Sequence, residues 1–261
     1  MYELTKKQKK MSTISLILGF SLLVISILIS KTAFHTGLPT CRHFIINTYL
    51  YLLASLILLS LFIMALDNTP ELNPYHSRLL VGRGIASFII MFIVIIFVLV
   101  VTMKIPSTNV LSKHLSWLLL VFLLSIVFYP SYYLSRETNL FYSTLITVAA
   151  MMSILTIFAF WKPEWISLSW GPVLLVGLIA AIILQLLLLA TGSAWEKGGI
   201  AKWLAWGIVF LFSVFILYDT KRIQVLAKQC KGHPDYVNHS LAFLLDLINL
   251  FTNLLRGNLL D

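Results

Sequence analysis

Long apolar stretches alternate with short polar connections along the entire chain of 261 residues. A helix needs about 20 mainly apolar residues to cross the hydrocarbon core of a bilayer. The stretches that reach or approach this length are residues 11–30, 44–66, 84–103, 115–134, 140–160, 172–191, 203–218 and 239–255. The pattern predicts an all-α integral membrane protein that crosses the bilayer several times.

The composition supports this class of protein and argues against a soluble one. Hydrophobic residues make up 59% of the chain and charged residues 11%, with a mean hydropathy of +0.94, whereas about 25% of the residues in soluble domains are charged. The net charge of +9 does not indicate nucleic-acid binding, because the basic residues are scattered among short connections. We interpret them as orientation signals and as contacts to anionic membrane lipids.

The distribution of basic residues predicts the direction of the helices, because cytoplasmic connections are enriched in lysine and arginine. If residue 44 starts on the cytoplasmic side, nine basic residues fall on that side and five on the other. The nine are Lys31, Arg42, Lys104, Lys113, Lys162, Lys221, Arg222, Lys228 and Lys231, and the five are Arg78, Arg83, Arg136, Lys197 and Lys202. Cys41 and Cys230 would then face a reducing compartment, and we expect both to be reduced, with neither a disulfide nor a metal between them.

The first apolar segment, residues 11–30, does not fit this orientation. If it spans the membrane, the four lysines before it (Lys6, Lys7, Lys9 and Lys10) lie on the outer side, against the charge rule. Three interpretations stay open: an extra spanning helix, an interfacial or re-entrant helix, and a signal anchor. We therefore divide the chain into residues 1–41, which hold the basic segment and this extra helix, and a membrane domain of residues 42–261.

The last apolar stretch carries acid and amide side chains that lipid disfavours. The residues that recur at steps of three and four, and so share one face of a helix, are His239, Ala242, Asp246, Asn249, Asn253 and Arg256. A carboxylate near the centre of a membrane helix costs about 2.5–3.5 kcal/mol, so Asp246 indicates a function. Asn249 and Asn253 have a plainer explanation as interhelical hydrogen-bonding groups. We expect the polar face to turn toward other helices or water, and the helix to be short for a full crossing.

A second acid, Asp219, ends the preceding apolar stretch. Because it lies beside Lys221 and Arg222, one explanation is a plain salt bridge. The other is that it meets Asp246. Two carboxylates close together in a medium of low dielectric constant cannot both be ionised without a large cost. A shared proton would hold them together and its loss would drive them apart, so the two acids are a candidate pH sensor.

Several segments of the C-terminal part resemble the Bax inhibitor-1 family, also called the transmembrane Bax inhibitor motif or lifeguard family. They are residues 212–223 (FSVFILYDTKRI), the pair Asp235-Tyr236, and residues 244–251 (LLDLINLF). Weaker similarity is found in residues 42–49 (RHFIINTY) and 104–109 (KIPSTN). The resemblance covers roughly residues 42–256 and does not include residues 11–30.

The resemblance implies a bundle of seven helices, six around a central seventh, to which this chain adds one N-terminal hydrophobic helix. It implies a calcium (cation) leak channel of intracellular membranes, of the endoplasmic reticulum or Golgi type, associated with suppression of cell death. The family's pH-sensing acid pair falls on Asp219 and Asp246. The implied partners are Ca²⁺, protons, membrane lipids, and cell-death regulators or other membrane proteins, with no cofactor and no nucleic acid.

The candidate ion pathway follows from the same side chains. Ca²⁺ prefers six to eight oxygen ligands, so Asp219 and Asp246 would bind it only weakly and transiently, with Asn249 and Asn253 as secondary groups. A weak site suits permeation, because the ion must leave again. Lys104 is a possible latch that contacts Asp219 when the gate is closed, although a lysine at a helix end more often extends to the membrane interface.

An enzyme is the main rival class, because intramembrane aspartyl proteases also use two acids on helices. Tyr218-Asp219 is similar to their first motif, but Asp246 lacks the flanking glycines of their second, and no Pro-Ala-Leu string occurs near the C-terminus. Zinc-protease and serine-hydrolase signatures are also missing from the sequence. We therefore expect no enzymatic activity. The alternatives to a leak channel are a non-transporting membrane regulator that acts through protein partners and a proton-coupled transporter.

Overall fold

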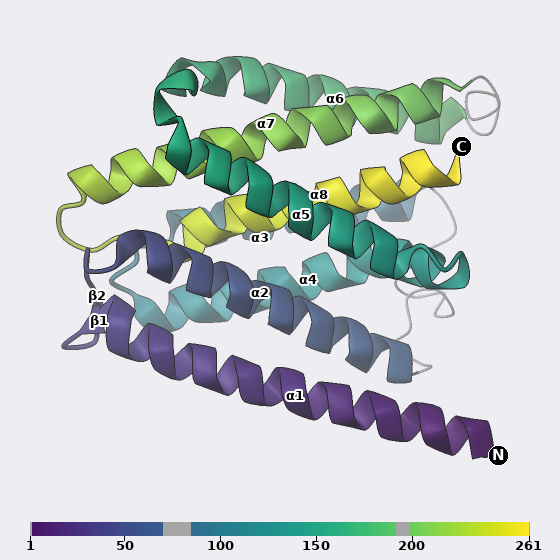
Figure 1. The fold of residues 1–261 in the computed structure, drawn as a ribbon, viewed down its shortest axis with the longest axis horizontal. Coiled ribbons are helices and arrows are strands. Elements are labelled where there is room, and N and C mark those ends of the chain that lie inside the picture. The colour runs from purple at the N-terminus through teal and green to yellow at the C-terminus, as the bar shows by residue number, and fades with distance from the viewer. Residues whose placement is uncertain (1, 70–84, 192–198, 261) are drawn as a thin grey trace. The chain divides into compact units, whose positions relative to one another are not determined.

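The computed structural model describes residues 2–69, 85–191 and 199–260, and these contain eight α-helices (Figure 1). The helices are α1 (Tyr2–Ala33), α2 (Phe44–Asn68), α3 (Ile85–Lys104), α4 (Val110–Glu137), α5 (Phe141–Trp161), α6 (Gly171–Thr191), α7 (Ile200–Gln229) and α8 (Tyr236–Leu259). Two short 3₁₀ helices, η1 (Pro163–Trp165) and η2 (Leu168–Trp170), connect α5 to α6. The prediction of an all-α membrane protein is confirmed. Arg78, Arg83 and Lys197, which entered the charge count, lie outside the described residues.

Seven helical segments in the described residues are long and apolar enough to cross a membrane. One of them is Thr13–Ala33 of α1, so the extra N-terminal segment has the dimensions of a spanning helix. Another is α8, whose 24 residues correspond to about 36 Å at 1.5 Å per residue. The expectation that the last helix is short for a full crossing is therefore wrong. The described apolar part of α3, Ile89–Lys104, is one of the shorter helices.

The chain divides into two compact units. The first comprises Met1–Pro130 and Cys230–Leu241, and the second comprises Ser131–Gln229 and Ala242–Asp261. Both α4 and α8 therefore contribute residues to each unit.

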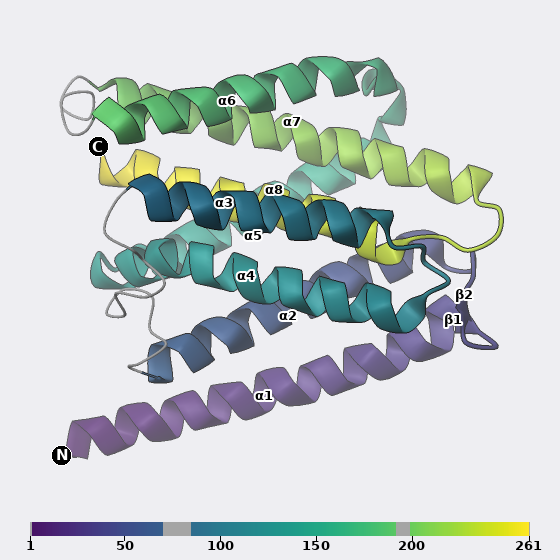
Figure 2. The same cartoon turned by 180° about the vertical axis from the view of Figure 1, so that it is seen from behind.

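In the first unit, α1 and α2 lie side by side and run in opposite directions (Figure 2). A hairpin of two short antiparallel strands, β1 (Phe34–His35) and β2 (Leu38–Pro39), connects them. Its turn is made by Thr36 and Gly37, which have φ angles of 51° and 82°, a conformation that glycine adopts without steric cost. Only 6% of the spanning part of α1 is buried, so most of its apolar surface is free to face lipid.

Polar side chains join α2 to α4 inside the apolar core of the first unit. The indole nitrogen of Trp117 donates a hydrogen bond to Ser55 Oγ at 3.0 Å, and the hydroxyl of Tyr129 donates to Asp67 Oδ1 at 2.7 Å. Tyr129 and Val121, both on α4, are fully buried. Such pairing is expected, because an unpaired polar group within a membrane costs several kcal/mol.

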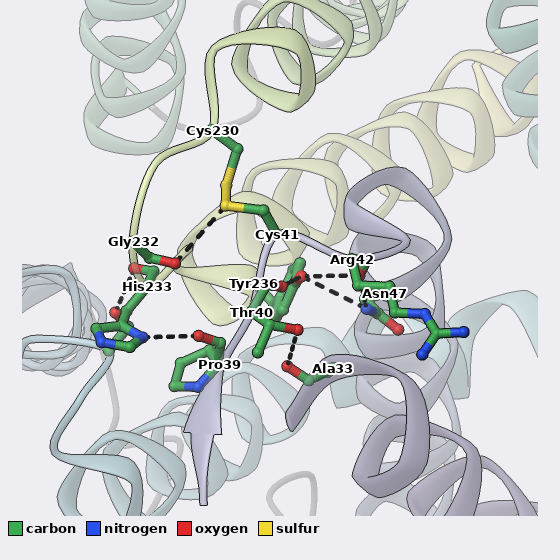
Figure 3. The surroundings of a disulfide bond; sticks show 11 residues. Ala33, Pro39, Thr40, Cys41, Arg42, Asn47, Cys230, Gly232, His233 and Tyr236 are labelled. Carbon is green, nitrogen blue, oxygen red and sulfur yellow. Dashed lines mark hydrogen bonds between the residues drawn. A yellow bond between two sulfur atoms is a disulfide. The ribbon is translucent and has the colours of Figure 1, made fainter. Parts of the chain in front are cut away.

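Cys41 and Cys230, both in the first unit, form a disulfide bond (Figure 3). The expectation that both cysteines are reduced is therefore wrong. Their Cα atoms lie 5.8 Å apart although 189 positions separate them in sequence, and this distance is in the range that a disulfide requires. The sequence spacing carried no signal of the pairing, because folding alone brings the two segments together.

In the second unit, α5 and α6 both pack against α7 (Figure 1). The buried residues of α7 recur mainly at steps of three and four and so form one face of the helix. They are Ala201, Ala205, Ile208, Val209, Phe212, Ile216, Asp219, Thr220 and Ile223. The helix does not end with the apolar run at residue 218 but continues to Gln229. Asp219 therefore lies inside a helix and not at its end.

Helix α8 is the most buried of the candidate spans, with 67% of its apolar window buried, compared with 17% for α5 and for the span that contains α6. It begins after Asp235, whose Oδ1 accepts a hydrogen bond from the backbone N–H of Asn238 at 2.9 Å. This is the geometry of an N-terminal cap. Protein packing around Phe243 and Leu244, both fully buried, compensates for the low hydrophobicity of the helix.

Candidate functional site

The structure brings the two predicted acids together inside the second unit. Asp219, on the buried face of α7, is 6% exposed, and Asp246, on α8, is 4% exposed. The two carboxylates are near enough for their charges to act on one another. The pairing places both acids among mainly apolar buried side chains, such as Phe212 and Ile216 on α7 and Leu247 and Leu250 on α8.

Asp219 also has a basic neighbour on its own helix. Arg222 Nη1 lies 3.9 Å from Asp219 Oδ1, one turn further along α7. The salt bridge considered from the sequence is therefore present. Half of the arginine side chain is exposed, so water screens its charge and such a contact contributes little to stability. Arg222 therefore does not fully compensate the burial of Asp219.

Asp246 is less well satisfied. Its Oδ2 atom is buried and has no hydrogen-bond partner within the described part of the chain. Burying an ionised carboxylate without a partner costs several kcal/mol, whereas a neutral carboxyl group costs much less. One proton shared with Asp219 would satisfy the orphaned oxygen and remove the repulsion between the two groups.

The two asparagines of α8 are held by hydrogen bonds. Asn253 is 2% exposed, and its Oδ1 accepts a bond of 3.3 Å from Gln185 Nε2 on α6. The side-chain nitrogens of Asn253 and Asn249 donate to backbone carbonyls one turn earlier in α8, at 2.9 and 2.8 Å. Asn253 thus connects two helices, the plainer of the two roles considered for it. The lining of an ion pathway by both residues stays a prediction.

Gln185 was missed by sequence reasoning. It is the only amide side chain in the apolar stretch that forms α6. An isolated amide in a membrane helix normally requires a partner on another helix, so this signal was available.

Two lysines lie near the connection between α3 and α4, Lys104 at the end of α3 and Lys113 near the beginning of α4. Lys104 ends α3 and is exposed, and its role as a latch for Asp219 stays a prediction. Lys113, counted only as an orientation signal, is 2% exposed. Its Nζ donates to Thr102 O at 2.7 Å, Ile105 O at 3.0 Å, Asp235 Oδ2 at 2.6 Å and Asn238 Oδ1 at 2.9 Å. We call these five residues the Lys113 cluster.

A tight metal site is not formed by the described residues, among which no three His, Cys, Asp or Glu side chains are grouped to hold an ion. The acid pair supplies two carboxylates, fewer than the six to eight oxygens that Ca²⁺ prefers in a firm site. Any Ca²⁺ at Asp219 and Asp246 would keep part of its water shell.

Taken together, the fold and this site define a multi-pass helical membrane protein with two acids buried on neighbouring helices. A family model described as "Inhibitor of apoptosis-promoting Bax1" matches residues 41–257. The chain therefore belongs to the Bax inhibitor family, and the resemblance noted from the sequence is confirmed. The match includes α2 to α7 and α8 as far as Gly257, and it leaves α1 outside. No curated protein and no solved structure was found to match the chain.

Proposed function

We propose that this protein is a pH-regulated cation leak channel, with Ca²⁺ as its main permeant ion. We place it in an intracellular membrane of the endoplasmic reticulum or Golgi type, where the leak contributes to suppression of cell death. Family membership supports the link to cell death. The observation that carries the channel proposal is the acid pair, Asp219 and Asp246, buried on two helices with one carboxylate oxygen unpartnered.

The proton shared by the two acids acts as the gate. With one proton present, a hydrogen bond between the carboxyl groups holds α7 and α8 together and the pathway is closed. With none, two like charges repel. Two unit charges about 4 Å apart repel by about 4 kcal/mol at an effective dielectric constant of about 20. A difference of a few kcal/mol is enough to invert the populations of two helix packings. Rising pH therefore opens the leak and falling pH closes it.

The permeating ion uses the same groups when they are ionised. Two carboxylates attract Ca²⁺, and too few protein oxygens surround it for firm binding. The amide oxygens of Asn249 and Asn253, on the same face of α8, provide the next weak contacts along the helix. Weak successive sites permit conduction. The proposal includes no catalytic step and no cofactor.

The test is Ca²⁺ flux through purified protein in liposomes, measured against pH for the wild type, Asp219→Asn and Asp246→Asn. The wild-type flux should rise with pH, and each amide variant should lose that dependence, because an amide cannot ionise. Asp67→Asn is a matched control: this acid, on α2, accepts a hydrogen bond from Tyr129, which an amide oxygen can also accept. Asp67→Asn should keep the wild-type pH profile.

Flux that is independent of pH and unchanged in both amide variants would rule out the gate. If the folded amide variants also keep the cellular effect on cell death, the protein acts as a regulator through partner proteins. That result would separate the transport proposal from the link to cell death.

A further inference from the structure

The disulfide between Cys41 and Cys230 joins two connecting segments of the first unit (Figure 3). Cys41 lies between β2 and α2, and Cys230 directly follows Gln229, the last residue of α7. Both cysteines are half-buried and lie outside the candidate membrane spans. Small thiol reagents in water can therefore approach a bond that fixes the beginning of the connection between α7 and α8.

Hydrogen bonds hold the rest of that connection without the disulfide. His233 Nδ1 is paired with Pro39 O at 2.8 Å, and Ser107 Oγ donates to His233 O at 2.8 Å. Asp235 is bound to Lys113 at 2.6 Å, and the hydroxyl of Tyr236 donates to Thr40 O. These contacts fix residues 233–236 whether the sulfur atoms are bonded or not.

Residues 228–231 have no comparable anchor. Within the described ranges, the side chains of Lys228, Gln229 and Lys231 make no hydrogen bond or ion pair, and all three are exposed. Among the described residues, the side-chain cross-link of this stretch is the bond between Cys230 and Cys41. Breaking it would release this short stretch and leave residues 233–236 in place.

The chemical setting favours exchange at this bond. Arg42 follows Cys41 and Lys231 follows Cys230, and a neighbouring positive charge stabilises the thiolate that takes part in thiol–disulfide exchange. In the orientation predicted from the basic residues, both cysteines face the cytoplasm. Disulfides in that compartment are rare, and those that form are usually transient and redox-sensing.

We propose that Cys41 and Cys230 form a reversible redox site whose disulfide tethers the beginning of the connection between α7 and α8 and whose reacting partners are dithiols. A thiolate of the dithiol attacks one sulfur, the Cys41–Cys230 bond breaks, and a mixed disulfide forms. The second thiolate of the dithiol then displaces the remaining cysteine. Two electrons and two protons pass to the protein, which gains two thiols, while the dithiol becomes a disulfide. The reverse reaction with an oxidised dithiol restores the tether.

The redox state can be measured directly. Cells that make the protein are quenched with acid, and free thiols are tagged with a maleimide that adds measurable mass. Two tags are expected during normal growth and none after treatment with a thiol oxidant such as diamide. Two outcomes overturn the proposal: a disulfide that persists throughout normal growth, which would make it a permanent structural bond, and thiols that never pair under oxidant.

The tether is tested on the purified full-length protein by tryptic cleavage after Lys228 and Lys231. Dithiothreitol should accelerate cleavage at both sites by about tenfold, because local opening becomes more frequent once the cross-link is gone. Cys41→Ser and Cys230→Ser should be cleaved at the fast rate with or without the reductant. Cleavage after Lys104, an exposed lysine at the end of α3, should not change.

Equal cleavage rates in oxidised and reduced wild-type protein would overturn the tether. So would acceleration at Lys104 to the same extent, because it would indicate general unfolding. Neither measurement uses ion flux, so these results are independent of whether the leak channel exists.

Discussion

At the scale of single residues, Lys113 shows how a charge can be accommodated in a membrane protein. Four oxygens lie within 3.0 Å of its ammonium group, which has three hydrogens to donate. One of the four belongs to Asp235, which supplies the opposite charge and also caps α8. The lysine thereby joins the end of α3, the beginning of α4 and the beginning of α8.

Replacing Lys113 by methionine should destabilise the protein strongly. The substitution keeps most of the volume but leaves Asp235, Asn238 and two carbonyl groups without their donor. Removing one partner of a buried ion pair costs about 3–5 kcal/mol. The free energy of unfolding is measured by denaturant titration in detergent micelles. The control is Lys104→Met, because Lys104 is exposed. This variant should change the free energy of unfolding by less than about 0.5 kcal/mol. Equal stabilities for the two variants would show that the cluster contributes nothing to the fold.

At the scale of elements, the contact between α7 and the C-terminal part of α8 depends on a glycine. A Cβ atom at Gly257 would lie 3.1 Å from Trp206 Cε2 and 3.2 Å from its Nε1. The missing side chain therefore allows the indole ring to lie against the backbone of α8. Gly207, the residue after that tryptophan, is different, because a Cβ atom there would meet nothing within 4 Å.

These two glycines form a matched pair for mutation. Gly257→Leu should lower the free energy of unfolding by about 1–3 kcal/mol, because the new side chain must displace the indole ring of Trp206. Gly207→Leu should be neutral or stabilising, because leucine favours a helix by roughly 0.5–1 kcal/mol over glycine. Denaturant titration in micelles measures both. A Gly257→Leu variant as stable as Gly207→Leu would mean that the two helices do not pack closely at this point.

At the scale of the whole molecule, the sequence predicted what depends on local pattern and missed what depends on folding. The helices could be predicted because apolar runs of membrane length have few alternatives. Asp246 could be predicted because an acid in such a run is costly. The residue at which α7 ends could not be predicted, because its last turns extend beyond the apolar run and carry Lys221 and Arg222. The disulfide and the Lys113 cluster could not, because residues more than 100 positions apart form them.

The count of basic residues and the spanning length of α1 give conflicting evidence for the orientation of the molecule in the membrane. The charge count favoured a cytoplasmic start for α2 by nine basic residues to five. The spanning length of α1 adds Lys6, Lys7, Lys9 and Lys10 to the opposite side and makes the two counts equal at nine. One argument for the predicted orientation remains. Lys6 to Lys10 are a single terminal run, whereas the other basic residues are spread over several connections. Each of those connections contributes to the orientation of its helices.

A labelling experiment tests this orientation. Thr36, in the connection between α1 and α2, and Asn139, in that between α4 and α5, are both exposed, with φ angles of 51° and 58°. Each is replaced by cysteine in a Cys41→Ser, Cys230→Ser background. In sealed vesicles with the cytoplasmic face outward, an impermeant maleimide should label Thr36→Cys at once and Asn139→Cys only after detergent, because α2, α3 and α4 separate the two positions. The reverse pattern would place the cysteine pair in an oxidising compartment. The disulfide would then be a permanent bond, and the lysines before α1 would lie in the cytoplasm, as the charge rule prefers.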